Sequence, residues 1–204
     1  RYMWAGIGDT YAKYYEACIS SRDERLEHFT ALGVSISVMC QKPLLEYGAK
    51  AYEDHKKGLC TYEVEQVILA IVVTTGIASI FLTKDYTPDY NSGLAHAIFY
   101  ALTSYPVIEK NHLHGEVVGF GVLLALLVDG QDEDFEKIYQ LNKSISRPLS
   151  LDEIEISKEQ WEESTDRIPD MSDVAHYPYK VTKEMLKNAM ARLEERVRKD
   201  NHVR

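Results

Sequence analysis

The sequence lacks three features that would place it outside the cytosol or in a membrane. Its cysteines, Cys18, Cys40 and Cys60, are odd in number and include no close pair, which is typical of reduced thiols in a cytosolic protein. No basic-then-apolar segment of the secretory kind opens the chain. The most apolar run, residues 67–82, is shorter than the roughly 18–20 residues that span a bilayer. We predict that this run forms a buried core helix.

An excess of positive charge is also missing. The 204 residues include 23 Lys and Arg against 32 Asp and Glu, for a net charge of −9 and a pI of about 5.3. Nucleic acids and anionic membranes both attract basic surfaces, so this balance argues against either as a partner. The length predicts one domain, and an apolar content of 45% is enough to form a core.

Convincing strands are absent beyond residue 5. Residues 1–5 are strand-like and lead into a Gly-rich turn, and the chain does not begin with Met. We interpret this start as a piece of something longer. The remainder shows helical periodicity, so the predicted fold class is an all-α helical bundle.

The predicted helices follow from periodicity, from proline positions and from capping patterns. "SLDE" at 150–153 and "SKEQ" at 157–160 match the capping box, and residues 84–93 form a turn-rich loop. In chain order we predict helices over 9–22, two stretches within 26–57 with Pro43 near the start of the second, 61–82, a helix containing His96, a helix from about His114, one following a polar turn within 129–146, short helices at the two capping boxes, and 181–200.

Two histidines, His96 and His114, open two of the apolar runs. They lie 18 positions apart, which on one unbroken helix would separate them by about 27 Å. Pro106 disfavours helical geometry at Tyr105, so the first helix should stop near Ser104. A second helix that folds back would bring both imidazoles toward one point.

Asp9 completes a plausible ligand set with these histidines. Carboxylate oxygen and imidazole nitrogen suit zinc, and three protein ligands leave one coordination position open for catalysis. Taken singly, each residue has an ordinary structural explanation, such as a core imidazole or a helix N-cap. Small neighbours, which allow a close approach of backbone or ligand, surround all three: Gly6, Gly8, Gly93, Ala95 and Gly115.

His112 competes with His114 for the same role. Residues two positions apart on a helix face different directions, so at most one of them belongs to a shared site. The glycine after His114 favours that residue. His112 is then a loop residue, with proton relay as its alternative role.

Three segments in order resemble a known family: "AGIGDTYAKYYEA" (5–17), "SGLAHAIFYALT" (92–103) and "HGEVVGFGVLLAL" (114–126). They are similar to the metal-binding half of the glycerol dehydrogenase branch of the iron-containing alcohol dehydrogenase superfamily. The resemblance continues to "YPYKVTKEML" (177–186). Members of that family have an N-terminal α/β domain that binds NAD and a C-terminal all-helical domain that supplies the metal. The resemblance implies that residues 1–204 form only the second, and that the NAD-binding domain is absent from this chain.

Matched by motif, the family's metal ligands fall on Asp9, His96 and His114. Iron-dependent members have a further histidine one helical turn after the aspartate, where this chain has Lys13. The resemblance therefore implies zinc, with Fe²⁺ as the alternative. With Lys13, the segment "GIGDTYAKYYE" (6–16) resembles at least as much relatives that act on hydroxycarboxylates or glycerol-1-phosphate, so those substrates stay open beside glycerol.

The activity implied is that of an NAD-dependent polyol or alcohol dehydrogenase, in which zinc polarises the substrate hydroxyl for hydride transfer. Glu116 is either a partner that orients an imidazole or a surface residue. The 204 residues alone should bind metal without turning over substrate. The alternative from another class is a helical binding or assembly module that binds no metal. We expect a cytoplasmic homo-oligomer.

Overall fold

A computed structural model describes residues 1–83 and 90–202. Every regular element in this part of the chain is helical, which confirms the all-α prediction. The elements in order are α1 (Tyr2–Ser20), α2 (His28–Lys56), α3 (Tyr62–Leu69), a π-helical turn (Ala70–Thr74), α4 (Thr75–Leu82), α5 (Leu94–Leu102), α6 (Pro106–Asn111), α7 (His114–Val128), α8 (Asp132–Ser144), a 3₁₀ turn (Asp152–Ile154), α9 (Lys158–Ser164), two 3₁₀ turns (Ile168–Asp170 and Ser172–Val174) and α10 (Lys183–His202).

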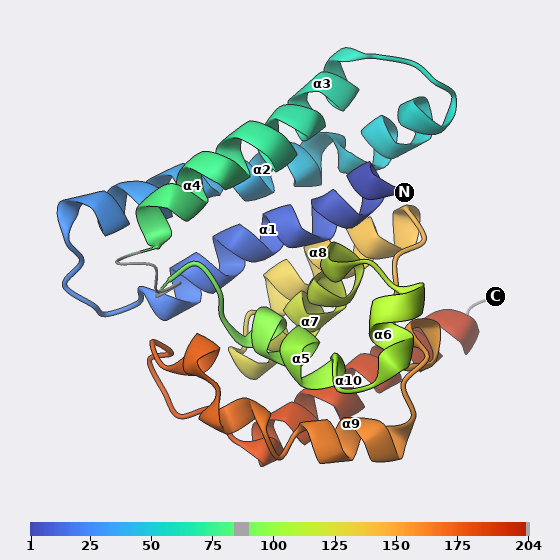
Figure 1. The fold of residues 1–204 in the computed structure, drawn as a ribbon. Coiled ribbons are helices and arrows are strands. Elements are labelled where there is room, and N and C mark those ends of the chain that lie inside the picture. Colours follow the sequence, from blue (N-terminus) through green and yellow to red (C-terminus); the bar gives the residue numbers. More distant parts are fainter. Residues whose placement is uncertain (84–89, 203–204) are drawn as a thin grey trace.

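Helix α1 lies between two groups of helices (Figure 1). On one side, α2 runs antiparallel to α3, the π-helical turn and α4, and these elements form a long helical hairpin. On the other side, α5, α8 and α10 pack against α7, and α9 packs against α5. Helix α7 is apolar around its whole circumference, and residues 115–127 are all buried, as expected of a central helix.

The predicted strand at residues 1–5 is wrong, because α1 already begins at Tyr2. Gly6 and Gly8 lie inside this helix and do not form a turn. A methyl group on Gly8 would collide with the carbonyl oxygen of Gly115, so the glycine permits a close crossing of α1 and α7. The same small residues that suggested a turn are required by helix packing.

The prediction of two helices within 26–57 is also wrong. Helix α2 is continuous and contains Pro43 in its interior. An interior proline removes a backbone hydrogen bond and costs about 3 kcal/mol. Buried Cys40, Leu44 and Gly48 recur at helical spacing on both sides of the proline. Packing of this continuous stripe offsets the loss.

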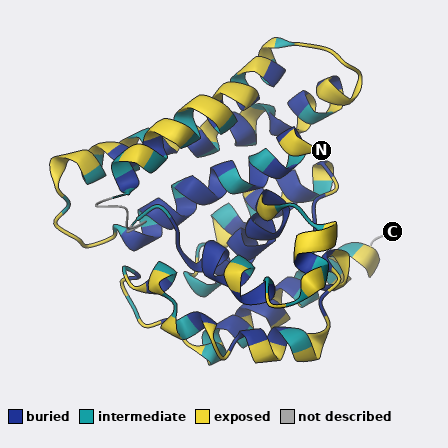
Figure 2. Ribbon diagram, viewed as in Figure 1, coloured by how far each residue is buried: buried dark blue, intermediate teal, exposed yellow. Residues whose placement is uncertain are grey.

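Residues 62–82 form the predicted helix, but the prediction that it is buried is wrong (Figure 2). One stripe of this helix faces α1 and α2, and the opposite side is exposed although it too is apolar. Nothing in the described part of the chain covers that side. By length and composition alone Tyr62–Leu82 could cross a membrane, and 22% of its most apolar window is buried in the protein.

The break at Pro106 is confirmed. Helix α5 ends at Leu102, α7 begins at His114, and the short helix α6 between them begins at the proline itself. Ser157 forms the predicted capping box with Gln160, whereas Ser150 precedes only a 3₁₀ turn. Of the predicted loop 84–93, residues 84–89 lie outside the described residues.

Candidate metal centre

The structure brings the three predicted ligands together. Asp9 lies in the middle of α1, His96 in the first turn of α5, and His114 is the first residue of α7. Asp9 Oδ1 is 3.4 Å from His96 Nε2 and 3.2 Å from His114 Nε2. One ligand atom from each residue falls within 4.8 Å of the other two. The fold-back of α7 after Pro106 therefore places both imidazoles at one point.

These separations suit a tetrahedral zinc ion. Zn–N and Zn–O bonds of about 2.1 Å at tetrahedral angles put neighbouring ligand atoms about 3.4 Å apart. The distances from the Asp9 oxygen to the two nitrogens match that value. The donor set, two nitrogens and one carboxylate oxygen, is also one that zinc accepts.

The surroundings of Asp9 and His96 shift the pKa values of both side chains. Burial alone would raise the pKa of Asp9, but hydrogen bonds with His114 and His96 outweigh it and hold this pKa well below its usual range. Burial alone would lower the pKa of His96. The charge of Glu16 and a hydrogen bond to Asp9 instead raise it to about 9. Asp9 is thus an anion at neutral pH, as a metal ligand must be.

Glu16 is the residue of the candidate site that the sequence reasoning missed. Its carboxylate is fully buried and lies 2.6 Å from His96 Nδ1, and it also accepts a hydrogen bond of 3.0 Å from the His96 backbone N–H. A carboxylate at Nδ1 leaves Nε2 as the coordinating atom and fixes the ring. Glu16 is two helical turns beyond Asp9, so it shares a face of α1 with it. That seven-residue spacing was the available signal.

Lys13, one turn beyond Asp9, does not add a ligand. Its Nζ donates hydrogen bonds to the backbone oxygen and the side-chain oxygen of Asn91, at 2.5 and 2.7 Å. Burial lowers the pKa of Lys13, and the charges of Asp9 and Glu16 oppose that shift. The lysine contributes positive charge beside two carboxylates.

His112 and Glu116 form a separate pair. His112 Nδ1 lies 3.0 Å from Glu116 Oε1, and its Nε2 lies 3.1 Å from Glu155 Oε2. Glu116 therefore orients an imidazole, but that of His112, and it is buried rather than at the surface. It also accepts a hydrogen bond from the Leu113 backbone N–H at the start of α7.

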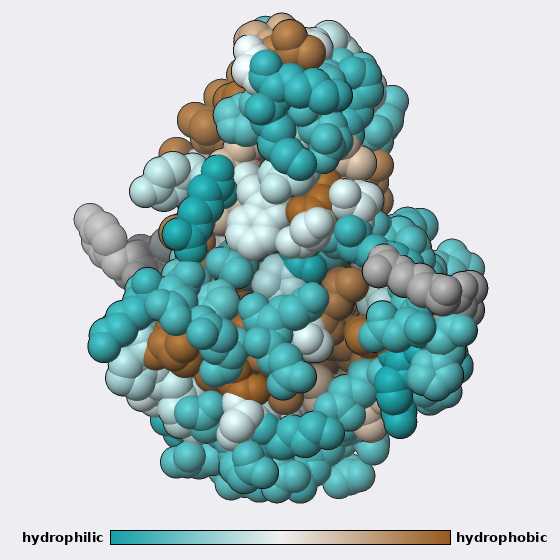
Figure 3. Space-filling view, turned by 90° about the vertical axis from the view of Figure 1, so that its right-hand side faces the viewer, coloured by the Kyte–Doolittle hydropathy of each residue, from teal (hydrophilic) through white to brown (hydrophobic). Residues whose placement is uncertain are grey.

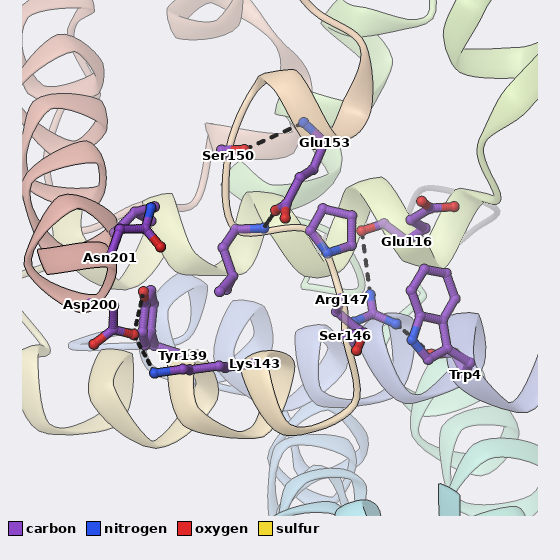
Figure 4. A pocket seen from close by; sticks show the side chains of 13 residues that line it. Trp4, Glu116, Tyr139, Lys143, Ser146, Arg147, Ser150, Glu153, Asp200 and Asn201 are labelled. Atoms are coloured by element: carbon purple, nitrogen blue, oxygen red, sulfur yellow. Dashed lines mark hydrogen bonds and ion pairs between the residues drawn. The ribbon is translucent and has the colours of Figure 1, made fainter. Parts of the chain in front are cut away.

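Buried Arg147 links the two helices that carry Asp9 and His114. Its guanidinium donates to the backbone oxygens of Trp4 in α1 and of Gly115 and Glu116 in α7, which joins the helices that carry Asp9 and His114. Arg147 also lines a cavity of about 550 Å³ (Figure 4). Across this cavity, Tyr139 and Lys143 both bind Asp200. None of the three predicted ligands lines it.

Glu16→Ala is expected to weaken zinc binding by about 10- to 100-fold, because His96 loses the carboxylate that fixes its ring. In Glu16→Gln the amide oxygen still accepts from Nδ1–H, so we expect most of the affinity to remain. Competition with a chromophoric chelator measures both constants, and circular dichroism reports whether each variant is folded. Equal, wild-type affinity in the two variants would contradict the positioning role.

A scan of protein-family models finds none that matches the chain. Among curated relatives, hydroxycarboxylate dehydrogenase A of Escherichia coli K12 is 31% identical over 157 residues, which covers 76% of this chain and 42% of that protein. A glycerol dehydrogenase of Escherichia coli O6:H1 is 28% identical over 167 residues, with 78% and 42% coverage. The chain is homologous to glycerol dehydrogenases and related dehydrogenases. It spans less than half the length of these two relatives.

A comparison with solved structures agrees with the sequence comparison. The crystal structure of a probable glycerol dehydrogenase from Sinorhizobium meliloti superposes with a TM-score of 0.79 over 98% of this chain and 56% of that one, at 24% identity. At this identity the match establishes the fold alone. The all-helical architecture is thus that of one part of a glycerol dehydrogenase-like protein, as the resemblance implied.

Proposed function

We propose that this chain is the metal-binding catalytic half of a polyol or alcohol dehydrogenase that uses zinc and NAD. The observation that carries the proposal is the meeting of Asp9, His96 and His114 at zinc-ligand separations in a homologue of such dehydrogenases. In the proposed two-domain protein, NAD is bound mainly by a nucleotide-binding domain, which residues 1–204 do not include.

The arrangement of the three side chains leaves one side of the site accessible. The His96 side chain is 7% exposed, whereas those of Asp9 and His114 are 33% and 43% exposed. His96 therefore forms the floor, and a small hydroxyl compound can approach past Asp9 and His114. A bound zinc ion supplies a Lewis acid that polarises the substrate hydroxyl. The protein's share is to hold the reacting carbon toward the nicotinamide.

The substrate class is a small polyol, with glycerol first. One relative acts, by its name, on a hydroxycarboxylate. The segment that contains Lys13 leaves hydroxycarboxylates and glycerol-1-phosphate as alternative substrates. The test is an NAD-reduction assay of the zinc-loaded full-length protein against glycerol, short diols, 2-hydroxy acids and glycerol-1-phosphate. Turnover of glycerol or a diol supports the proposal. Turnover by residues 1–204 alone would contradict the two-domain assignment.

The competing function is a helical assembly module without metal. Metal analysis of the purified full-length protein separates the two, since one zinc per chain supports the enzyme. A protein that binds neither zinc nor iron after incubation with each would favour the assembly module. In either case we expect a cytoplasmic homo-oligomer.

Zinc binding at pH 7–8 is expected to release about one proton from His96. The pKa of this imidazole is about 9 without metal, so the ring is protonated at neutral pH, but only a neutral ring coordinates zinc. The zinc affinity should consequently rise with pH up to about 9 and level off above it. Calorimetric titrations in buffers of different ionisation enthalpy measure the proton count. A binding enthalpy that is independent of the buffer would contradict this assignment.

A further inference from the structure

The helical hairpin carries an exposed apolar face that the metal chemistry does not explain. Residues 28–41 of α2 and residues 67–82 contain no Asp, Glu, Lys or Arg, although 27% of the whole chain is charged. The two stretches lie against each other, since the rings of Phe29 and Phe81 stack at 6.0 Å and Cys40 Sγ lies 3.9 Å from Thr75 Oγ1. Two exposed helical stretches of this length without charge are unusual on a protein surface.

The exposed apolar side chains on this face form one ridge. Leu69, Val73, Ile77 and Ile80 recur at intervals of four, four and three residues, which is the spacing of one helix face. Their exposed fractions run from 41% to 74%. Side chains of the neighbouring helix extend the face. The apolar ridge comprises Phe29, Leu32, Met39, Leu69, Val73, Ile77 and Ile80. Figure 3 shows hydrophobic atoms along this flank of the hairpin, at the upper left.

We propose that the apolar ridge is the surface on which a second copy of this chain packs, hairpin against hairpin, around a twofold axis. A standard stable interface buries roughly 800 Å² on each partner, and seven large side chains exposed to this extent supply apolar area of that order. Two antiparallel helices that meet the same pair from another copy form a four-helix arrangement with self-complementary contacts.

Charge also favours a second copy. Two chains of net charge −9 repel each other least where they meet through uncharged surface, and every residue of the ridge belongs to one of the two uncharged stretches. A partner recognised through its charge would find no complementary group here. The proposal depends on this surface and not on the metal site, so either can fail alone.

A membrane is the less favoured occupant. The opposite side of the same helix is built into the core through Val64, Val67, Ala78 and Leu82, so the helix cannot enter a bilayer without leaving α1 and α2. Binding along an anionic membrane surface calls for basic residues around the apolar face. The two stretches themselves contain none, and the chain as a whole is acidic.

The test compares the full-length protein with two variants by sedimentation velocity. We expect the double variant Ile77→Glu/Ile80→Glu to halve the native mass, because burying two carboxylates opposes the contact. Val38→Glu is the matched control, since Val38 is 44% exposed on the same hairpin but lies about 100° around α2 from Met39. It should leave the mass unchanged. The substituted positions are exposed, so circular dichroism should show both variants folded.

Any of three results would overturn the proposal. The first is a monomeric wild-type protein, and the second is a double variant with the wild-type mass. The third is flotation of the wild-type protein with lipid vesicles that the double variant loses, because the ridge would then be a membrane contact. Zinc content and turnover are measured on the same samples, so failure of the metal site is recognised separately.

Discussion

His114→Ala is expected to abolish stoichiometric zinc binding, with a loss of affinity of at least about 100-fold. The variant leaves two ligands, and removal even of a group that only orients a ligand costs 10- to 100-fold. The side chain of His114 is 43% exposed, so its removal leaves no buried charge unpaired. Helical content should stay near wild type. In the full-length protein we expect dehydrogenase turnover to disappear with the zinc.

His96→Ala is expected to lose zinc as well, but its stability should also fall. The fully buried carboxylate of Glu16 would lose its imidazole partner, and an unpaired buried charge is strongly destabilising. His114→Ala is therefore the cleaner test of coordination. A thermal unfolding measurement without metal separates the two effects.

His112→Ala is the matched control, because His112 lies two residues from His114 but binds Glu116 and Glu155. Its zinc affinity should remain within about threefold of wild type. Zinc is measured by chelator competition and by metal analysis after gel filtration. Loss of zinc from His112→Ala, with zinc retained in His114→Ala, would show that the wrong histidine had been chosen.

The meeting of the two histidines could be predicted from the sequence because it depends on a local rule. Pro106 stops α5, and the chain then folds back through α6, so that α7 begins with His114 beside His96, with their ring centroids 5.2 Å apart. Glu16 was missed because a carboxylate in a helix is usually exposed to solvent, and the sequence does not show that this one is buried. Its spacing of seven from Asp9 carried the information.

The errors in the fold have a common physical origin. Gly6 and Gly8 suggested a turn, and Pro43 suggested a helix start, because local propensity was read without tertiary contacts. In the structure, α7 crosses close to Gly8, the side chain of Ile71 packs on Gly6, and a buried stripe continues past the proline. Residues 67–82 were predicted to be buried because they are apolar. Composition cannot distinguish contact with the core from contact with another molecule.

Gly115→Ala is expected to destabilise the protein by about 3 kcal/mol or more, because the new methyl group overpacks the crossing of α1 and α7. The methyl would overlap the carbonyl oxygen of Ala5 and lie 3.1 Å from Asp9 Cβ. Neither neighbour can move aside, since one is helix backbone and the other is fixed to it. Separation of the helices would also pull Asp9 away from His114, so zinc affinity should fall together with stability.

Gly76→Ala is the matched control for this substitution. Gly76 lies inside α4, and an added methyl group there has no atom within 4 Å. Alanine is the better helix former by about 0.5–1 kcal/mol, so this variant should be slightly stabilised. Urea unfolding of both variants measures the difference. If Gly115→Ala were as stable as Gly76→Ala, α1 and α7 could not cross as closely as the structure shows, and the three ligands would lose the contact that holds them together.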